Sequence, residues 1–204
     1  MADKPDRFPQ PATSHFPLST SLEPWLAAGL VTVVAALTYG ILIPQLGFYH
    51  DDWYMLWAGQ SAGLAGIIRL FQTDRPLIGW VYALAFKFIG ADVLAWQIYA
   101  LLLKIISGLA VLWLLRLVWP TKRLETTCAA LLFVLYPGFY QQPVAATFVT
   151  DLLGLDAAFI SIALTIYALD LTGFQKPVRS VVATLAAAAL GLFYIALYEA
   201  TIGL

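Results

Sequence analysis

The sequence places an imidazole and two carboxylates side by side, at His50, Asp51 and Asp52, directly after a long apolar run. Adjacent carboxylates repel each other, which raises the pKa of one of them, and such a pair can act as a general base or bind a divalent cation such as Mg²⁺ or Mn²⁺. Asp52 is the candidate metal ligand of the pair. The alternative is that both acids are solvated residues that cap a helix.

A second candidate group is the run Asp74-Arg75-Pro76-Leu77. Arginine binds phosphate well because its planar guanidinium donates two parallel hydrogen bonds, and Pro76 suits the first turn of a following helix. The alternatives for Arg75 are a salt bridge to Asp74 or contact with a lipid headgroup. Together with the acid pair, Arg75 indicates a substrate that carries a phosphate and a group to be deprotonated.

The elements that must position these residues are strongly apolar. Of the 204 residues, 61% are hydrophobic and 11% are charged, and the mean hydropathy is +0.82. Soluble domains have about 45–50% apolar and about 25% charged residues, so the composition excludes a soluble globule. The net charge of −1 offers no basic surface for nucleic acid, and the single cysteine, Cys128, excludes a disulfide framework within the chain.

The hydropathy pattern predicts an all-α, polytopic membrane helix bundle, because several charge-free stretches approach the roughly 20 residues that cross a bilayer. Residues 1–23 hold four prolines among polar residues and are expected to form a disordered cytoplasmic tail. Residues 24–204 are expected to form the transmembrane domain, truncated at its C-terminus. The five predicted spans are Trp25–Leu46, Val93–Trp119, Thr126–Tyr140, Pro143–Leu171 and Arg179–Ala200.

Residues 47–92, between the first two spans, mix charges and aromatics with two shorter apolar runs. Such runs are typical of helices that lie along the membrane surface, which predicts interfacial helices over Trp53–Phe71 and Ile78–Phe88. The alternative is a true span across Met55–Phe71. Five aromatic side chains are expected at headgroup level, namely Trp53, Tyr54, Trp57, Trp80 and Tyr82.

The distribution of basic residues predicts the orientation. With the N-terminus in the cytoplasm, the cytoplasmic segments hold seven Lys and Arg residues and the segment 47–92 holds three, Arg69, Arg75 and Lys87. The positive-inside rule therefore favours a multi-pass protein of the cell membrane with a cytoplasmic N-terminus and residues 47–92 on the extracytoplasmic face.

Three phrases carry a family resemblance. An acidic pair follows the first span in FYHDDWYMLW, an R-P-L helix closes on Phe-Ile-Gly in DRPLIGWVYALAFKFIG, and a proline precedes Asp-Leu-Leu in LYPGFYQQPVAATFVTDLLGLDAAF. This order resembles the N-terminal part of the GT-C superfamily of membrane glycosyltransferases, which includes the protein O-mannosyltransferases and the bacterial aminoarabinose transferases. The resemblance covers roughly residues 25–171.

The resemblance implies transfer of a sugar from a polyprenyl-phosphate carrier on the exported face of the membrane. By the same resemblance, Asp51 matches the catalytic acid, Asp52 the acidic residue beside it, and Arg75 a basic residue near the lipid phosphate. We also expect His50 to contact the substrate. The chain departs from the family in two ways: it has about half as many spans, and Gln141 and Gln142 stand where some members carry an acid.

Several other charges lie within or near the predicted spans. Lys104 and Asp156 differ in depth by only about 3 Å at 1.5 Å rise per residue, and unpaired charges at that depth are costly, so we predict a structural pair, with a proton or ion path as the alternative. Asp151, about 12 Å below the outer interface, either supports the site or makes a plain polar contact. Glu199 either joins the acid cluster or is an exposed interfacial acid.

Two further function classes remain beside the glycosyltransferase. One is a transporter or flippase subunit that uses Lys104, Asp151 and Asp156 as an intramembrane relay. The other is an inactive fragment or scaffold. Membrane lipids are expected partners in every case.

Overall fold

A computed structural model describes residues 22–136, 143–173 and 177–198, and these residues form helices and no strands. Four helical segments are long and apolar enough to cross a membrane: Glu23–Gln45, Val93–Val118, Ala145–Asp170 and Pro177–Leu197. The predicted all-α membrane bundle is therefore confirmed. The predicted tail, up to residue 21, and Glu199 lie outside the described residues.

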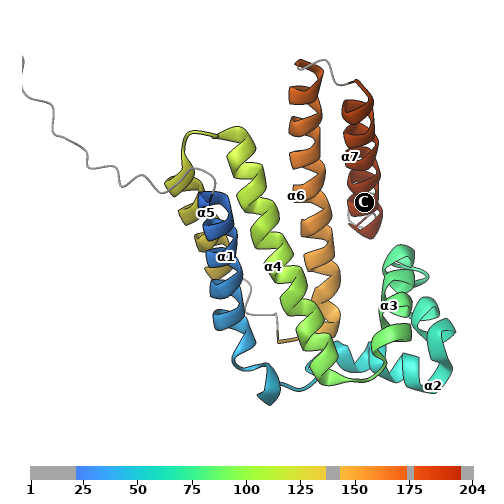
Figure 1. Cartoon of the computed structure of the whole chain (residues 1–204). Helices are drawn as coiled ribbons and strands as arrows, with labels where there is room; N and C mark the ends of the chain where they lie inside the picture. Colours follow the sequence, from blue (N-terminus) through green and yellow to red (C-terminus); the bar gives the residue numbers. More distant parts are fainter. Residues whose placement is uncertain (1–21, 137–142, 174–176, 199–204) are drawn as a thin grey trace, which may run out of the picture.

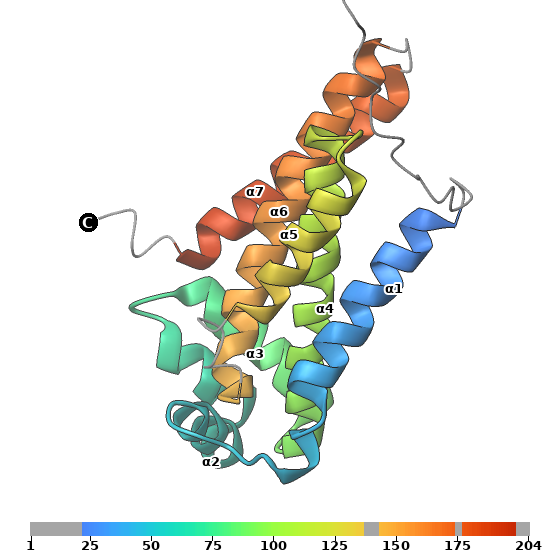
Figure 2. The same ribbon diagram turned by 90° about the vertical axis from the view of Figure 1, so that its left-hand side faces the viewer.

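The long helices run side by side (Figures 1 and 2). Helix α1 (Glu23–Ala35) continues through a π-helical turn, η1 (Ala36–Gly40), and a 3₁₀ turn, η2 (Ile43–Gln45), which contains Pro44. Helix α4 (Val93–Val118) packs between α1 and α6 (Ala145–Gly173), and α7 (Pro177–Tyr198) packs along α6. The four long helices thus form a row in the order α1, α4, α6 and α7, in which α4 and α6 run parallel because both begin at the same end of the bundle.

The expected third span corresponds to the short helix α5 (Arg123–Leu135). Its 13 residues rise about 20 Å, less than the roughly 30 Å of the hydrocarbon core, so four of the five expected spans reach full length and α5 does not. Helix α5 begins beside α1, where Arg123 lies 3.6 Å from Glu23, and near its end the Val134 carbonyl accepts a hydrogen bond from Tyr39 at 2.9 Å. It packs against both α1 and α4.

Helices α2 (Asp52–Phe71) and α3 (Pro76–Ile89) gather at the end of the bundle where α4 begins, here called the site end (Figure 1). Both were predicted as helices, and neither is among the four candidate spans, so the alternative of a spanning Met55–Phe71 is not supported. Helix α2 kinks at Gly63, whose φ of 63° is a conformation that glycine adopts freely.

A close approach joins α2 and α3. A Cβ atom on Gly79 of α3 would lie 3.2 Å from backbone atoms of Ile68 in α2, and one on Gly59 of α2 would meet the Phe86 ring of α3 at 2.6 Å. These two glycines let the helices pack with almost no gap. The pair therefore forms a unit that can hold side chains from both helices around one cavity.

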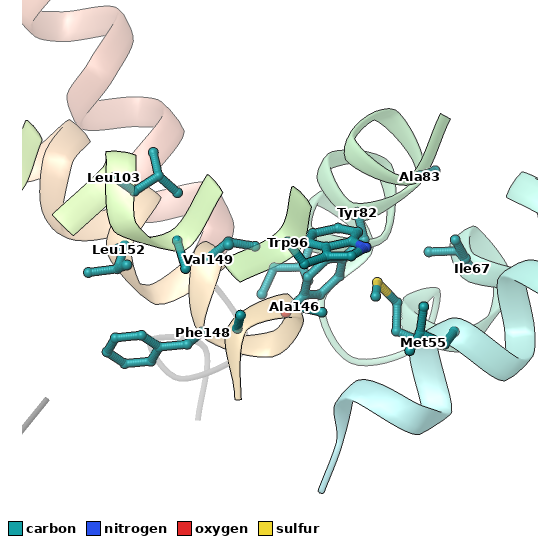
Figure 3. Close-up of a cluster of buried hydrophobic side chains, with 14 of the residues drawn as sticks. Met55, Ile67, Tyr82, Ala83, Trp96, Leu103, Ala146, Phe148, Val149 and Leu152 are labelled. Atoms are coloured by element: carbon teal, nitrogen blue, oxygen red, sulfur yellow. The ribbon is translucent and has the colours of Figure 1, made fainter. Parts of the chain in front are cut away.

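A buried apolar cluster seats α2 and α3 on the bundle. Figure 3 shows Tyr82 of α3 and Trp96 of α4 at its centre, with Met55 and Ile67 of α2 on one side and Ala146 and Val149 of α6 on the other. Trp96 is fully buried, and its indole N–H donates to the Gly90 carbonyl at 2.9 Å. A second cluster joins α1, α4 and α5.

Candidate functional site

The two adjacent acids at the start of α2 have opposite environments. Asp51 is exposed and lines a cavity, whereas Asp52 is completely buried. Successive residues of a helix point about 100° apart, so one of two neighbours can face the packed interior while the other faces outward. Of the two adjacent acids, the Asp51 carboxylate is therefore accessible to a substrate, and the Asp52 carboxylate is enclosed by the protein.

Asp52 joins α2 to the beginning of α6. Its Oδ1 accepts hydrogen bonds from the Thr147 backbone N–H at 2.8 Å and from the Thr147 hydroxyl at 2.9 Å, and its Oδ2 accepts one from the Tyr49 N–H at 3.2 Å. Burial nevertheless raises the pKa of Asp52 above its ordinary value of 3.8, because desolvation outweighs the hydrogen bonds that favour the carboxylate. These contacts tie the start of α2 to the first turn of α6 and to the turn before α2.

Two cavities meet at Asp51. The first has a volume of about 510 Å³ and is lined by Tyr49, His50, Asp51, Pro143, Val144, Thr147, Phe148 and Asp151. The second, of about 340 Å³, lies between α2, α3 and α6, and its lining includes Arg75, Asp74, Tyr54 and Phe71. Asp51, Thr147 and Asp151 line both cavities. The structure thus brings Asp51, Arg75 and Asp151 together from three helices.

Arg75 precedes the first turn of α3, where Pro76 begins the helix as its sequence position predicts. Its side chain is 38% exposed, and its Nε lies 3.6 Å from Asp74 Oδ2, which is an ion pair but longer than a hydrogen bond. The salt bridge to Asp74, which was the alternative to phosphate binding, is therefore present, and Arg75 also lines the second cavity. A phosphate in that cavity would meet a cation that is only partly neutralised.

His50 lies in the turn before α2 and lines the first cavity. Its φ of 47° is a left-handed conformation, which is uncommon for a residue with a side chain. The Asp52 N–H bonds the Tyr49 carbonyl at 3.0 Å and the Trp53 N–H bonds the His50 carbonyl at 3.3 Å, so the turn is held from both sides. This geometry places the imidazole at the cavity wall beside Asp51.

Three polar residues to which the sequence motifs assign no role at the site, Thr147, Tyr82 and Gln97, link its helices. Thr147 binds Asp52, and the buried hydroxyl of Tyr82 donates to the Thr147 carbonyl at 2.6 Å. Gln97 of α4 donates to the carbonyls of Pro143 at 2.7 Å and of Gly47 at 3.3 Å. No local sequence signal marks these residues, because their partners lie 46 to 95 positions away.

Two expectations about this region need correction. Tyr82 was expected at headgroup level with the other aromatics, but it is 2% exposed and packed inside the apolar cluster, whereas Trp53, Trp57 and Trp80 are exposed. Pro143 was expected in the first turn of α6, but the helix begins at Ala145, and the carbonyl of Pro143 is instead a partner of Gln97. Tertiary packing decides both positions.

Among the described residues, no three His, Cys, Asp or Glu side chains cluster closely enough to hold a metal ion. The Asp52 carboxylate, predicted as the metal ligand, already accepts three hydrogen bonds from protein groups. Asp51 and Asp151 are the two acids that line both cavities.

Lys104 and Asp156 lie together deeper in the bundle, away from these cavities. Both are buried, at 0% and 4% exposure, and their charges attract each other across the α4–α6 interface. The Ser107 hydroxyl donates a hydrogen bond to Asp156, and the Lys104 ammonium lies 5.0 Å from the centroid of the Phe133 ring and 5.5 Å from that of Tyr39. Aromatic faces stabilise a cation at such distances.

Comparison with protein-family models, with curated proteins and with solved structures found no match. The class that the fold defines is a polytopic α-helical membrane protein.

Proposed function

We propose that this protein is an integral-membrane glycosyltransferase that moves a sugar from a polyprenyl-phosphate carrier to an acceptor on the extracytoplasmic face of the cell membrane. The observation that carries the proposal is the shared wall of the two cavities: an exposed acid, Asp51, stands between a cavity that holds Arg75 and one that holds His50. The GT-C resemblance of the same motifs supports it. We further propose that the N-terminus lies in the cytoplasm.

The proposed reaction is a substitution at the anomeric carbon. The oxygen or nitrogen of the acceptor's hydroxyl or amine attacks that carbon, and the Asp51 carboxylate takes the proton that this group loses. The bond from the anomeric carbon to the phosphate oxygen breaks, and its electron pair leaves with polyprenyl phosphate. Arg75 stabilises the charge that develops on this leaving group, because its guanidinium is a cation that can donate two parallel hydrogen bonds to a phosphate. No oxidant or further reactant is required.

The cavities suit a reaction at the membrane surface. The Arg75 cavity combines this cation and three acids, Asp51, Asp74 and Asp151, with apolar and aromatic walls that include Met55, Leu70 and Phe71. The apolar walls suit the hydrocarbon chain of a lipid-linked donor, and Arg75 is the group that would bind its phosphate. Exposed aromatic side chains on the same two helices, at Trp53, Trp57 and Trp80, are of the type that lies at headgroup level. A lipid-linked donor would therefore reach Arg75 without leaving the membrane.

The decisive experiment measures sugar transfer from a radiolabelled polyprenyl-phosphate sugar by the protein in nanodiscs. Asp51→Asn keeps the shape of the side chain and removes the base, so transfer should fall by about 10²–10⁴-fold. Asp170→Asn is a matched control, because Asp170 is an exposed aspartate near the far end of α6. Equal transfer by Asp51→Asn and wild type would refute the role of Asp51.

The same preparation tests the transporter alternative and the metal. A transporter would move intact donor across the membrane of a proteoliposome without producing a glycosylated product, and Asp51→Asn would leave that movement unchanged. Chelation with EDTA is expected to leave the transfer rate unchanged, since the proposed step uses Asp51 and Arg75 alone. Loss of transfer on chelation, with recovery on adding Mg²⁺ or Mn²⁺, would show that a cation takes part.

A further inference from the structure

We infer that Asp52 is a positioning residue that caps helix α6 from the neighbouring helix α2, and that this cap fixes Asp51 opposite Asp151 for the proposed reaction. The inference rests on the proposed function for its catalytic consequence and on the contacts of Asp52 for its structural part. It differs from the role as second catalytic acid or metal ligand that the paired motif predicts.

The amino end of α6 explains why an acid is needed there. The first N–H groups of a helix have no partners within the helix, and Thr147 is the third residue of α6. Its N–H donates to Asp52 Oδ1 at 2.8 Å, although the two residues are 95 positions apart. A carboxylate is also favoured there by the partial positive charge at a helix N-terminus. Asp52 itself begins α2, so two helix N-termini share its charge.

The cap has a direct consequence for the cavities. Asp51 precedes Asp52 in the chain, and Asp151 follows Thr147 by about one helical turn. The bond between Asp52 and Thr147 therefore sets the spacing between the two acids that line both cavities. The Tyr49 N–H on Oδ2 extends the same restraint to the turn that carries His50. Loosening the cap would displace the base from the acceptor.

Substitutions at Thr147 test the cap without removing an acid. Thr147→Val loses the hydroxyl bond and keeps the N–H, whereas Thr147→Ser keeps both donors. We expect Thr147→Val to lower kcat by about 10- to 100-fold with a small change in KM, because misplacing a catalytic group reduces rate more than binding, and Thr147→Ser to restore it. Thr165→Val is the matched control, since the Thr165 hydroxyl donates to the Ser161 carbonyl of its own helix.

Asp52→Asn separates positioning from catalysis. The amide oxygen can still accept both Thr147 donors, while the amide nitrogen cannot accept from Tyr49. A positioning role predicts that Asp52→Asn leaves the shape of the pH–rate profile unchanged and keeps any dependence on divalent cation concentration unchanged. A changed profile, or a higher cation requirement, would show that Asp52 is a base or a ligand and would overturn the inference.

A measurement without substrate keeps the inference testable if no transfer is found. Hydrogen–deuterium exchange of the peptide that contains Thr147 should be faster in Asp52→Ala than in wild type, with Asp52→Asn close to wild type. If the wild-type protein transfers no sugar but exchange is faster in Asp52→Ala, the cap between Asp52 and Thr147 is supported and the proposed function is refuted. Unchanged exchange in Asp52→Ala, or equal kcat in Thr147→Val and Thr165→Val, would end the inference.

Discussion

The hydroxyl of Tyr82 donates a hydrogen bond to the backbone carbonyl of Thr147 at 2.6 Å and lies 3.2 Å from the Thr150 hydroxyl, which fastens α3 to the first turns of α6. Burial raises the pKa of Tyr82, because the phenolate would be desolvated, so the hydroxyl keeps its proton and remains a donor at any physiological pH. The helix that begins next to Arg75 is thereby held against the helix that carries Asp151.

Tyr82→Phe is expected to destabilise the protein by about 0.5–1.5 kcal/mol, the usual net value of one hydrogen bond, without creating a cavity. The measurement is the unfolding midpoint in detergent, with Tyr54→Phe as control because the Tyr54 side chain is 67% exposed. Equal midpoints for the two variants would mean that the Tyr82 hydroxyl contributes no net stability.

Removing either member of the Lys104 and Asp156 pair alone should destabilise the protein by about 3–5 kcal/mol, because the other charge is left buried. Lys104→Met and Asp156→Leu together should cost far less than the sum of the two single changes. A double-mutant cycle on unfolding free energies provides the measurement. Simple additivity would show that the two charges do not stabilise each other.

The pH dependence of stability should carry a contribution from Asp52. Because its folded pKa is raised above its ordinary value, the folded state binds this proton more tightly than the unfolded state. The Asp52 contribution to unfolding free energy should therefore be lowest at neutral pH and should increase as pH falls through the folded pKa toward 3.8.

The difference between wild type and Asp52→Asn isolates this contribution, since asparagine does not titrate. We expect the unfolding midpoint of wild type to rise relative to that of Asp52→Asn as the pH falls from 7.5 to 4. A constant difference over this range would mean that the pKa of Asp52 is not raised by folding.

Labelling of introduced cysteines should report the orientation. Cys128 is exposed and must first be replaced by alanine. With the proposed N-terminus in the cytoplasm, cysteines at Ser61 and Asp74 should react with an impermeant maleimide added to intact cells, because both positions are exposed and lie in the segment 47–92. Protection of both, with reaction only after permeabilisation, would reverse the topology.

Much of the secondary structure follows from local sequence. The predicted helices over Trp53–Phe71 and Ile78–Phe88 are present as α2 and α3, and the expected spans near α1, α4, α6 and α7 are present within a few residues at each end. Hydropathy over about 20 residues and the preference of proline for a first helical turn are local properties, so they can be recognised without tertiary contacts. Arg75 and Pro76 at the start of α3 are an example.

What the sequence determined by itself is the membrane bundle and the chemistry available at its site end: an acid pair, an arginine and aromatics between two long apolar helices. Only the tertiary structure decided which acid is buried, because Asp51 and Asp52 are equivalent in type and differ in the face they turn to α6. It also decided that Tyr82 is internal. In a membrane protein the lipid-facing and protein-facing surfaces of a helix are equally apolar, so hydropathy cannot assign its buried face, and the packing partners do.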